Sequence, residues 1–145
     1  MKHSIWAYAS VLLVVAVATG CARAARDTSG FAIVDSAAFD APAETVWQTT
    51  KVVLRDLDLD IYTRDKRGTF VAFSGAKRHL FVPHRTKYSI TLQPISADAT
   101  RLSIETVRQV YGVTLLTYPD WHDRKATDNK IAMDIIEGVK AKLAH

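Results

Sequence analysis

Apolar and polar residues alternate in several stretches of the chain, which is the pattern of half-buried β-strands. In the two clearest stretches, Ile90 and Leu92 fall on one side, as do Leu102 and Ile104. Polar turns at 65–68 and 96–100 separate neighbouring stretches and predict hairpins. We therefore expect strands at residues 31–39, 59–64, 69–74, 88–94 and 101–111.

Two other stretches have the spacing of amphipathic helices. The first begins at Asp40-Ala41-Pro42-Ala43-Glu44, where proline and an acidic residue suit a helix start, and ends near Asp58. Its predicted buried stripe is Val46, Trp47, Thr50, Val53, Leu54 and Leu57. The second begins between Asp123 and Asp128, runs to about Leu143, and has the stripe Ile131, Ile135, Ile136, Val139 and Leu143.

The order of these elements is β-α-β-β-β-β-α. Consecutive hairpins flanked by helices favour an α+β fold, in which an antiparallel sheet of four to five strands has both helices packed on one face. Residues 75–87 are polar and basic and are expected to be a loop. Residues 113–118 either extend the sheet or cross to the last helix, and Tyr118-Pro119-Asp120 ends this segment.

The first 20 residues do not resemble domain material. Lys2 and His3 precede an uncharged run, Ile5–Ala18, which is shorter than the roughly 20 apolar residues of a membrane span. The sequence Ala18-Thr19-Gly20-Cys21 resembles the bacterial lipobox. This resemblance implies that the leader is removed before Cys21 and that Cys21 carries acyl chains. An uncleaved single span remains the alternative.

The resemblance also implies a location. Asp directly after the lipidated cysteine commonly favours retention in the inner membrane, but here the residue is Ala22. We therefore expect the periplasmic leaflet of the outer membrane, with the inner membrane as the alternative. The predicted organisation is a signal peptide at 1–20, a lipidated N-terminus and tether at 21–30, and a single α+β periplasmic domain at 31–145.

The element order itself has a resemblance. This order resembles that of small bacterial envelope lipoproteins of helix-grip or TATA-binding-protein-like type. The features that carry the resemblance are a lipobox, a tether, a strand, a proline-started helix with Val46-Trp47, an antiparallel meander and a C-terminal helix. Examples are the BamC-like lipoprotein of the outer-membrane barrel assembly machinery and uncharacterised periplasmic lipoproteins of this length. The resemblance implies a non-catalytic adaptor or envelope-maintenance domain.

Charge is distributed unevenly. The composition, 48% hydrophobic and 23% charged, is that of an ordinary globular chain. However, residues 64–87 contain seven Lys or Arg against one acid, Asp65, for a net charge of +6, whereas the rest of the chain after residue 20 has about −3. Within this segment, Leu80-Phe81-Val82-Pro83 is flanked by the candidate anion-binding cations Lys77, Arg78, Arg85 and Lys87.

Two interpretations of the basic segment remain open. Its cations and apolar centre can contact anionic lipid, a polyanionic glycan or an acidic envelope protein. Alternatively, the apolar tetrapeptide is an edge strand or a tucked hairpin, and its flanking charges and Pro83 discourage pairing with other chains. Nucleic acid is not an expected partner, because a lipidated envelope protein does not meet it.

Signatures of catalysis and cofactor binding are not found in the sequence. Gly-x-Ser-x-Gly, His-Glu-x-x-His and a phosphate-binding glycine loop are all absent, and the single cysteine excludes an internal disulfide. The acids at 56–60 resemble a calcium loop, but Ile61 and Arg67 occupy its required Gly and Glu positions. We therefore expect no enzyme activity and no cofactor.

Two further clusters are assigned structural roles. His79, His84 and His122 lack the neighbouring carboxylates of a metal site and are expected to be surface histidines. The segment Tyr118–Asp123 is expected to enter the last helix with Trp121 packed against it, or else to line a ligand groove. The predicted function is non-catalytic binding of an envelope component, and the alternative is a grip domain holding a small or lipidic molecule between sheet and C-terminal helix.

Overall fold

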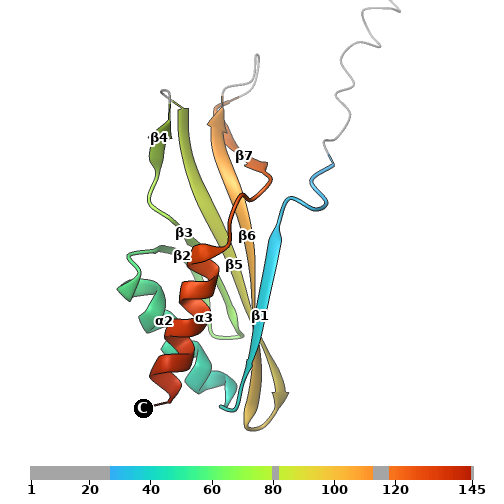
Figure 1. Cartoon of the computed structure of the whole chain (residues 1–145), viewed down its shortest axis with the longest axis vertical. Coiled ribbons are helices and arrows are strands. Elements are labelled where there is room, and N and C mark those ends of the chain that lie inside the picture. The colour runs from blue at the N-terminus through green and yellow to red at the C-terminus, as the bar shows by residue number, and fades with distance from the viewer. Residues whose placement is uncertain (1–26, 80–81, 113–117, 145) are drawn as a thin grey trace, which may run out of the picture.

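The fold is described from a computed structural model for residues 27–79, 82–112 and 118–144 (Figure 1). The predicted leader and Cys21 lie outside these residues. The elements, in chain order, are β1 (Ile33–Phe39), α2 (Ala43–Asp56), β2 (Asp60–Asp65), β3 (Thr69–Phe73), β4 (Lys77–His79), β5 (Val82–Ser96), β6 (Ala99–Gly112), β7 (Asp120–Arg124) and α3 (Lys130–Leu143).

All strand pairs are antiparallel, in the order β1-β6-β5-β3-β2. The short strands β4 and β7 extend the sheet at one end. Strand β4 pairs with β5 beyond the last residue of β3, and β7 pairs with β6 beyond the first residue of β1. The predicted α+β class with an antiparallel sheet and two helices is therefore confirmed. The predicted strand count is too low, since the described residues form seven strands.

Helices α2 and α3 pack on the same face of the sheet and cover only part of its length (Figure 1). Even-numbered residues of β5 and β6 point toward them, and Ile90, Leu92, Leu102 and Ile104 are at most 3% exposed. Both predicted helical stripes contribute to this core, with Leu57, Ile131 and Leu143 only partly buried. The two helices also contact each other closely, since a Cβ at Gly138 would lie 2.9 Å from Val53 Cγ1.

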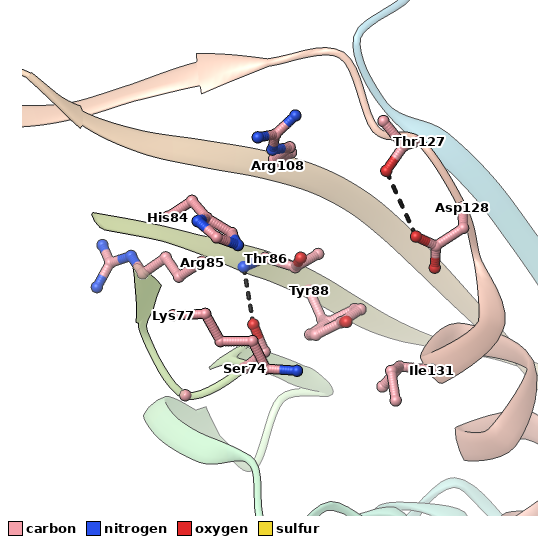
Figure 2. A pocket seen from close by; sticks show the side chains of 11 residues that line it. Ser74, Lys77, His84, Arg85, Thr86, Tyr88, Arg108, Thr127, Asp128 and Ile131 are labelled. Atoms are coloured by element: carbon pink, nitrogen blue, oxygen red, sulfur yellow. Dashed lines mark hydrogen bonds between the residues drawn. The ribbon is translucent and has the colours of Figure 1, made fainter. Parts of the chain in front are cut away.

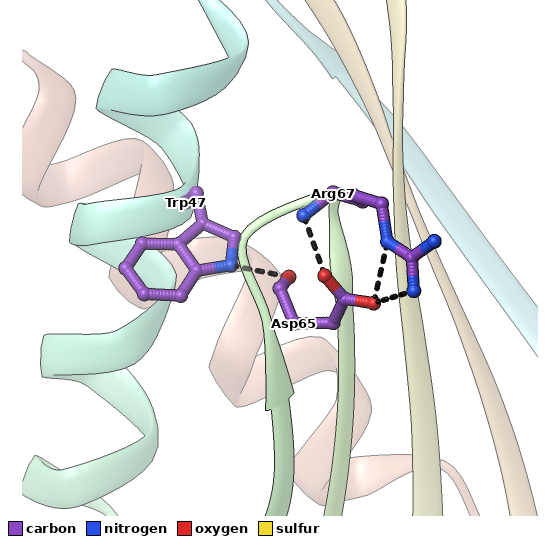
Figure 3. A network of polar contacts seen from close by, with 3 residues as sticks. All are labelled: Trp47, Asp65 and Arg67. Carbon is purple, nitrogen blue, oxygen red and sulfur yellow. Dashed lines mark hydrogen bonds and ion pairs between the residues drawn. The ribbon is translucent and has the colours of Figure 1, made fainter.

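Trp47 joins α2 to the β2–β3 hairpin (Figure 3). Its Nε1–H donates to the backbone oxygen of Asp65 at 3.0 Å, and its ring stacks on Phe70 with centroids 5.3 Å apart. The turn of this hairpin is the predicted one, with Gly68 at φ +109°. Arg67 donates two side-chain hydrogen bonds to the Asp65 carboxylate and lowers its pKa.

The expected loop at residues 75–87 is wrong. Residues Lys77–His79 form β4, and β5 begins at Val82 rather than Tyr88. The polar sequence can be a strand here because backbone pairing to β4 on one side and β6 on the other satisfies its peptide groups without requiring apolar side chains. For the described Val82 and Pro83, antiparallel pairing with β4 agrees with the hairpin alternative and not with an edge strand. Leu80 and Phe81 lie outside the described residues.

The expected helix entry at Tyr118–Asp123 is likewise wrong. Asp120–Arg124 is strand β7, hydrogen-bonded to the edge of β6 that β1 leaves unpaired. Helix α3 begins at Lys130, later than predicted, and the preceding Asn129 donates its side-chain amide to Asp35 Oδ1 at 2.8 Å. The alternatives considered for residues 113–117 fall outside the described part of the chain.

The sheet therefore has two halves. The projecting half consists of residues 74–79, 82–87, 107–112 and 118–125, where β4, β5, β6 and β7 extend past the helices (Figure 1). The covered half is the remainder of the described chain. Because β1 is antiparallel to β6, the chain before Ile33 leaves toward the projecting half, and the Phe31 oxygen accepts a hydrogen bond from Ala126 N–H at 2.8 Å.

Candidate functional site

Charge is separated along the sheet. The projecting half contains seven Lys or Arg and two acids, Asp120 and Asp123, for a net charge of +5. The covered half contains nine Lys or Arg and 13 acids, for a net charge of −4. The cations of the projecting half are Lys77, Arg78, Arg85, Lys87, Arg108, Arg124 and Lys125. The basic segment seen in the sequence is thus joined by cations from β6 and β7.

The four candidate cations do not share one face. Lys77 pairs with His84, so it lies on the helix-bearing face of the sheet. Arg78 pairs with Pro83 and therefore lies on the opposite face, which we call the open face. Arg85 and Lys87 alternate with the buried Tyr88 and also belong to the open face. The projecting half consequently presents cations on both sides.

On the helix-bearing face, a cleft of about 370 Å³ lies between the projecting half and the start of α3 (Figure 2). Lys77, His84 and Arg108 contribute nitrogen groups to its lining, and Thr127 and Asp128 lie across from them. The backbone N–H of Thr86 donates to Ser74 Oγ at 2.9 Å and holds the β3–β4 connection against β5. This lining is polar and predominantly cationic, so it suits an anionic group better than an apolar ligand.

Tyr88 closes the inner end of this cleft. The residue is 3% exposed and lines the cleft beside Ile131. Burial raises the pKa of the Tyr88 hydroxyl, so the group is a neutral hydrogen-bond donor at neutral pH. The cleft therefore combines cations with a hydroxyl donor.

The open face of the projecting half carries a cluster that the sequence did not predict. The guanidinium carbon of Arg85 lies 3.8 Å from the ring centroid of Phe73 and 4.1 Å from that of Trp121. We call these three residues the Arg85 stack. Its outer rings have further aromatic neighbours, because Tyr62 contacts Phe73 edge-on and Tyr111 contacts Trp121 edge-on.

A polar chain fixes the position of Arg85 within the stack. Arg85 Nε–H donates to Gln109 Oε1 at 2.8 Å, and Gln109 Nε2–H donates to Asp123 Oδ1 at 2.8 Å. Gln109 is only 8% exposed. No short-range sequence signal could reveal this cluster, because Phe73, Arg85 and Trp121 belong to three strands and meet only through the sheet register.

Of the histidines considered from sequence, His84 and His122 lie in strands that are not direct neighbours. Val110 of β6 pairs with both residues, one on each side, so two strand spacings separate their backbones, about 10 Å. Within residues 27–79, 82–112 and 118–144, no group of three potential metal ligands is close enough to hold an ion. None of the described helices is long and apolar enough to cross a membrane.

Comparison with known proteins adds no assignment. No protein-family model matches the chain, and no curated protein shows significant similarity to it. The geometry of the projecting half is therefore the basis for assigning function.

Proposed function

We propose that this protein is a lipid-anchored, non-catalytic binding module of the bacterial envelope. In this proposal, Cys21 carries the anchor and the projecting half contacts an anionic envelope component. The observation that carries the proposal is the charge separation, +5 in the projecting half against −4 in the covered half. Such a charge distribution orients the molecule in the field of an anionic surface.

The direction of the N-terminal chain favours an anionic bilayer as that component. Phe31 is held beside Ala126, at about the level of Arg108, and six residues separate Cys21 from Thr28. Six extended residues span about 20 Å. The distance along β6 from Arg108 to Gly112 is about 14 Å, from four residues at 3.4 Å each. The tether is therefore long enough for the projecting half to touch the membrane that holds the anchor.

Exposed apolar groups accompany the cations. Val82 is 45% exposed, Tyr111 38% and Tyr118 93%. Tyrosine is favoured at membrane–water interfaces, and each Lys or Arg near an anionic bilayer contributes about 1 kcal/mol. These side chains support contact with lipid headgroups.

The anchor is tested by the mass of the mature chain. We expect a protein that begins at Cys21 and carries diacylglyceryl and acyl groups, and we expect Cys21→Ala to abolish incorporation of labelled palmitate. The single-span alternative predicts an intact N-terminus at Met1 in both proteins. An unmodified Cys21 in membrane-bound protein would refute the anchor.

The contact surface is tested with the mature lipoprotein in nanodiscs that contain brominated lipid. Lipid quenching of Trp121 fluorescence, measured in a Trp47→Phe background, is expected to be stronger with phosphatidylglycerol present than with phosphatidylethanolamine alone. Lys77, Arg78 and Lys125, all exposed, are changed to Glu together. We expect this triple reversal to remove the dependence on phosphatidylglycerol.

The matched control reverses three exposed cations of the covered half, Arg64, Arg101 and Lys140, which changes the net charge equally. Quenching of Trp121 should be unchanged in this control. Equal losses in both triple variants would mean that net charge alone acts, and no loss in either would exclude the projecting half as the contact.

The cleft beside α3 favours a second candidate function, the holding of a small ligand between sheet and C-terminal helix. Because Lys77, His84 and Arg108 line it, the ligand would be anionic rather than purely apolar. Native mass spectrometry of the purified protein tests this function. A retained anion that is lost in Lys77→Gln would support it, and a ligand-free mass would count against it.

A further inference from the structure

The Arg85 stack leaves one part of the guanidinium available. With a ring from β3 on one side and a ring from β7 on the other, an acceptor reaches Arg85 most readily along the edge of the guanidinium plane. The Nε–H is already bonded to Gln109. Within the described part of the chain, neither Nη1 nor Nη2 has a hydrogen-bond acceptor or an ion-pair partner. The free edge is therefore a two-donor fork.

The surroundings make this fork a stronger binder than an ordinary surface arginine. Desolvation lowers the pKa of Arg85, and attraction to the nearby Asp120 carboxylate only partly offsets this effect. A partly desolvated guanidinium whose two η nitrogens have no acceptor among the described residues interacts strongly with an incoming anion. Because the rings and Gln109 fix the guanidinium before binding, little side-chain entropy is lost on binding.

A groove of about 250 Å³ adjoins the fork. Most of its walls are apolar or aromatic, and they come from Ile61, Tyr62, Phe73, Ala76 and Trp121. Ser74 and Asp60 complete the lining together with Arg85. The volume is below the usual range of about 300–1,000 Å³ for whole small-molecule pockets, so it suits one apolar group with its attached anion.

The local charge selects the kind of anion. Among the described residues that line this groove, Arg85 is the one Lys or Arg, whereas Asp60 also lines it and Asp120 lies close enough to interact with Arg85. A doubly charged phosphate would be attracted by one cation, Arg85, and repelled by two carboxylates, those of Asp60 and Asp120. A carboxylate has a single charge and matches the planar fork with two parallel hydrogen bonds.

We propose that the open face of the projecting half contains a binding site for a monocarboxylate attached to an apolar or aromatic group. The η nitrogens of Arg85 bind the carboxylate, and the rings of Tyr62, Phe73 and Trp121 contact the apolar group. The aromatic rings of this site lie on the open face, whereas His84 and Tyr88 of the cleft beside α3 lie on the helix-bearing face, and Ser74 and Arg85 line both cavities. The site does not depend on the membrane contact proposed above.

The test uses the ¹⁵N-labelled full chain in detergent micelles and four probes. N-acetylphenylalanine has both required groups, its amide lacks the carboxylate, acetate lacks the apolar group, and phenyl phosphate has a second charge. The indole N–H signal of Trp121 reports on the site. The indole of Trp47, which is bonded to the Asp65 oxygen, is the internal reference. We expect N-acetylphenylalanine to shift the Trp121 signal alone.

The amide and acetate are each expected to bind at least about tenfold more weakly, since two charge-assisted hydrogen bonds or the apolar contact are lost. Phenyl phosphate should also bind more weakly than N-acetylphenylalanine. Equal binding of the acid and the amide would overturn the role of Arg85. Tighter binding of phenyl phosphate would overturn the assignment to a singly charged group.

Two variants complete the test. Arg85→Lys keeps the charge but lacks the planar fork, and we expect about tenfold weaker binding of N-acetylphenylalanine. Arg101→Gln removes an exposed cation on the same face of the sheet, in the covered half, that does not line the groove, so binding should be unchanged. Unweakened binding by Arg85→Lys, with the Trp47 signal in its native position, would refute the site. The comparison of acid and amide on the unaltered chain remains decisive if Arg85→Lys does not fold.

Discussion

The two halves of the β5–β6 hairpin have the same backbone and opposite environments. In the covered half, the helix-bearing face of these strands presents Ile90 and Ile104, both 0% exposed. In the projecting half, the same face continues with His84 and Arg108, which line a polar cleft. The ladder of backbone hydrogen bonds continues from one half into the other. In the covered half, burial of apolar side chains by the helices fixes the register of β5 against β6. The same register sets the face of each residue in the projecting half, where no helix requires the side chains to be apolar.

The halves also differ in what holds them together. The covered half has a continuous apolar core between sheet and helices. In the projecting half, the contacts described above between strands are backbone pairs, aromatic and polar contacts around Arg85, the ring contact between Tyr111 and Trp121, and the hydrogen bond from Thr86 to Ser74. We therefore expect the projecting half to open locally at lower free energy than the covered half.

The largest contrast is expected from removing apolar volume on the same face of β6. Ile104→Ala should lower the free energy of unfolding by about 2–5 kcal/mol, because it leaves a cavity in the core. Val110→Ala in the projecting half, where the residue is half-buried, should cost less than about 1 kcal/mol. Urea denaturation measures both. Similar costs at the two positions would show that the projecting half has a core after all.

The Arg85 stack gives the next largest effect. Arg85→Ala should lower the local opening free energy of β7 by about 1–2 kcal/mol, since contacts to two rings are lost. Hydrogen exchange is then expected to accelerate at His122 and Arg124, whose backbone N–H groups face β6, while Leu102 and Ile104 keep their protection. Lys87→Ala, on the same face, serves as the control. Faster exchange throughout the sheet would contradict the independence of the two halves.

Tyr88 lies at the boundary between the halves and gives a pH-dependent effect. Its pKa is raised by burial in the folded protein, so the unfolded chain releases the proton first. Its contribution to stability is present below the unfolded pKa of about 10 and is lost as the pH rises above that value. Unfolding midpoints from pH 8 to 11 should fall less steeply for Tyr88→Phe than for the unaltered chain. Parallel profiles would place the hydroxyl in contact with water.

The smallest effect is expected from an ion pair between the helices. Lys142 Nζ lies 3.0 Å from Asp56 Oδ2, but the two side chains are 44% and 56% exposed. Lys142→Met should change the free energy of unfolding by less than about 1 kcal/mol, and added salt should remove the difference. A larger loss would mean that this pair takes part in packing α3 against α2.

The sequence predicted the covered half well because burial leaves a periodic signature. Ile90 and Leu92, Leu102 and Ile104, and the stripes of both helices all follow from that periodicity. Strand β7 has the same alternation, with Trp121 and Asp123 on one face and His122 and Arg124 on the other. Neither of its faces is covered by a helix, so both are polar enough to be mistaken for a helix entry.

The candidate site could be predicted only in part. A local excess of charge identified Lys77, Arg78, Arg85 and Lys87, because charge can be counted along the chain. Which face each cation occupies follows from which residues of β5 are buried. Burial of residue 87 in place of 88 would move every side chain of the strand to the opposite face, and the sequence does not decide between these two registers. Arg108 and Arg124 joined them only once β6 and β7 were seen to pair.

The direction of β1 has a mechanical consequence. A pull on the N-terminal chain that is directed past the projecting half acts along the axis of β1, because the chain leaves β1 at that end of the strand (Figure 1). Seven residue pairs with β6, from Ile33–Thr106 to Phe39–Thr100, are then loaded in shear together. A strand pulled from a side edge would instead unzip one pair at a time. The fold is thus arranged to carry tension from its N-terminus without peeling the sheet.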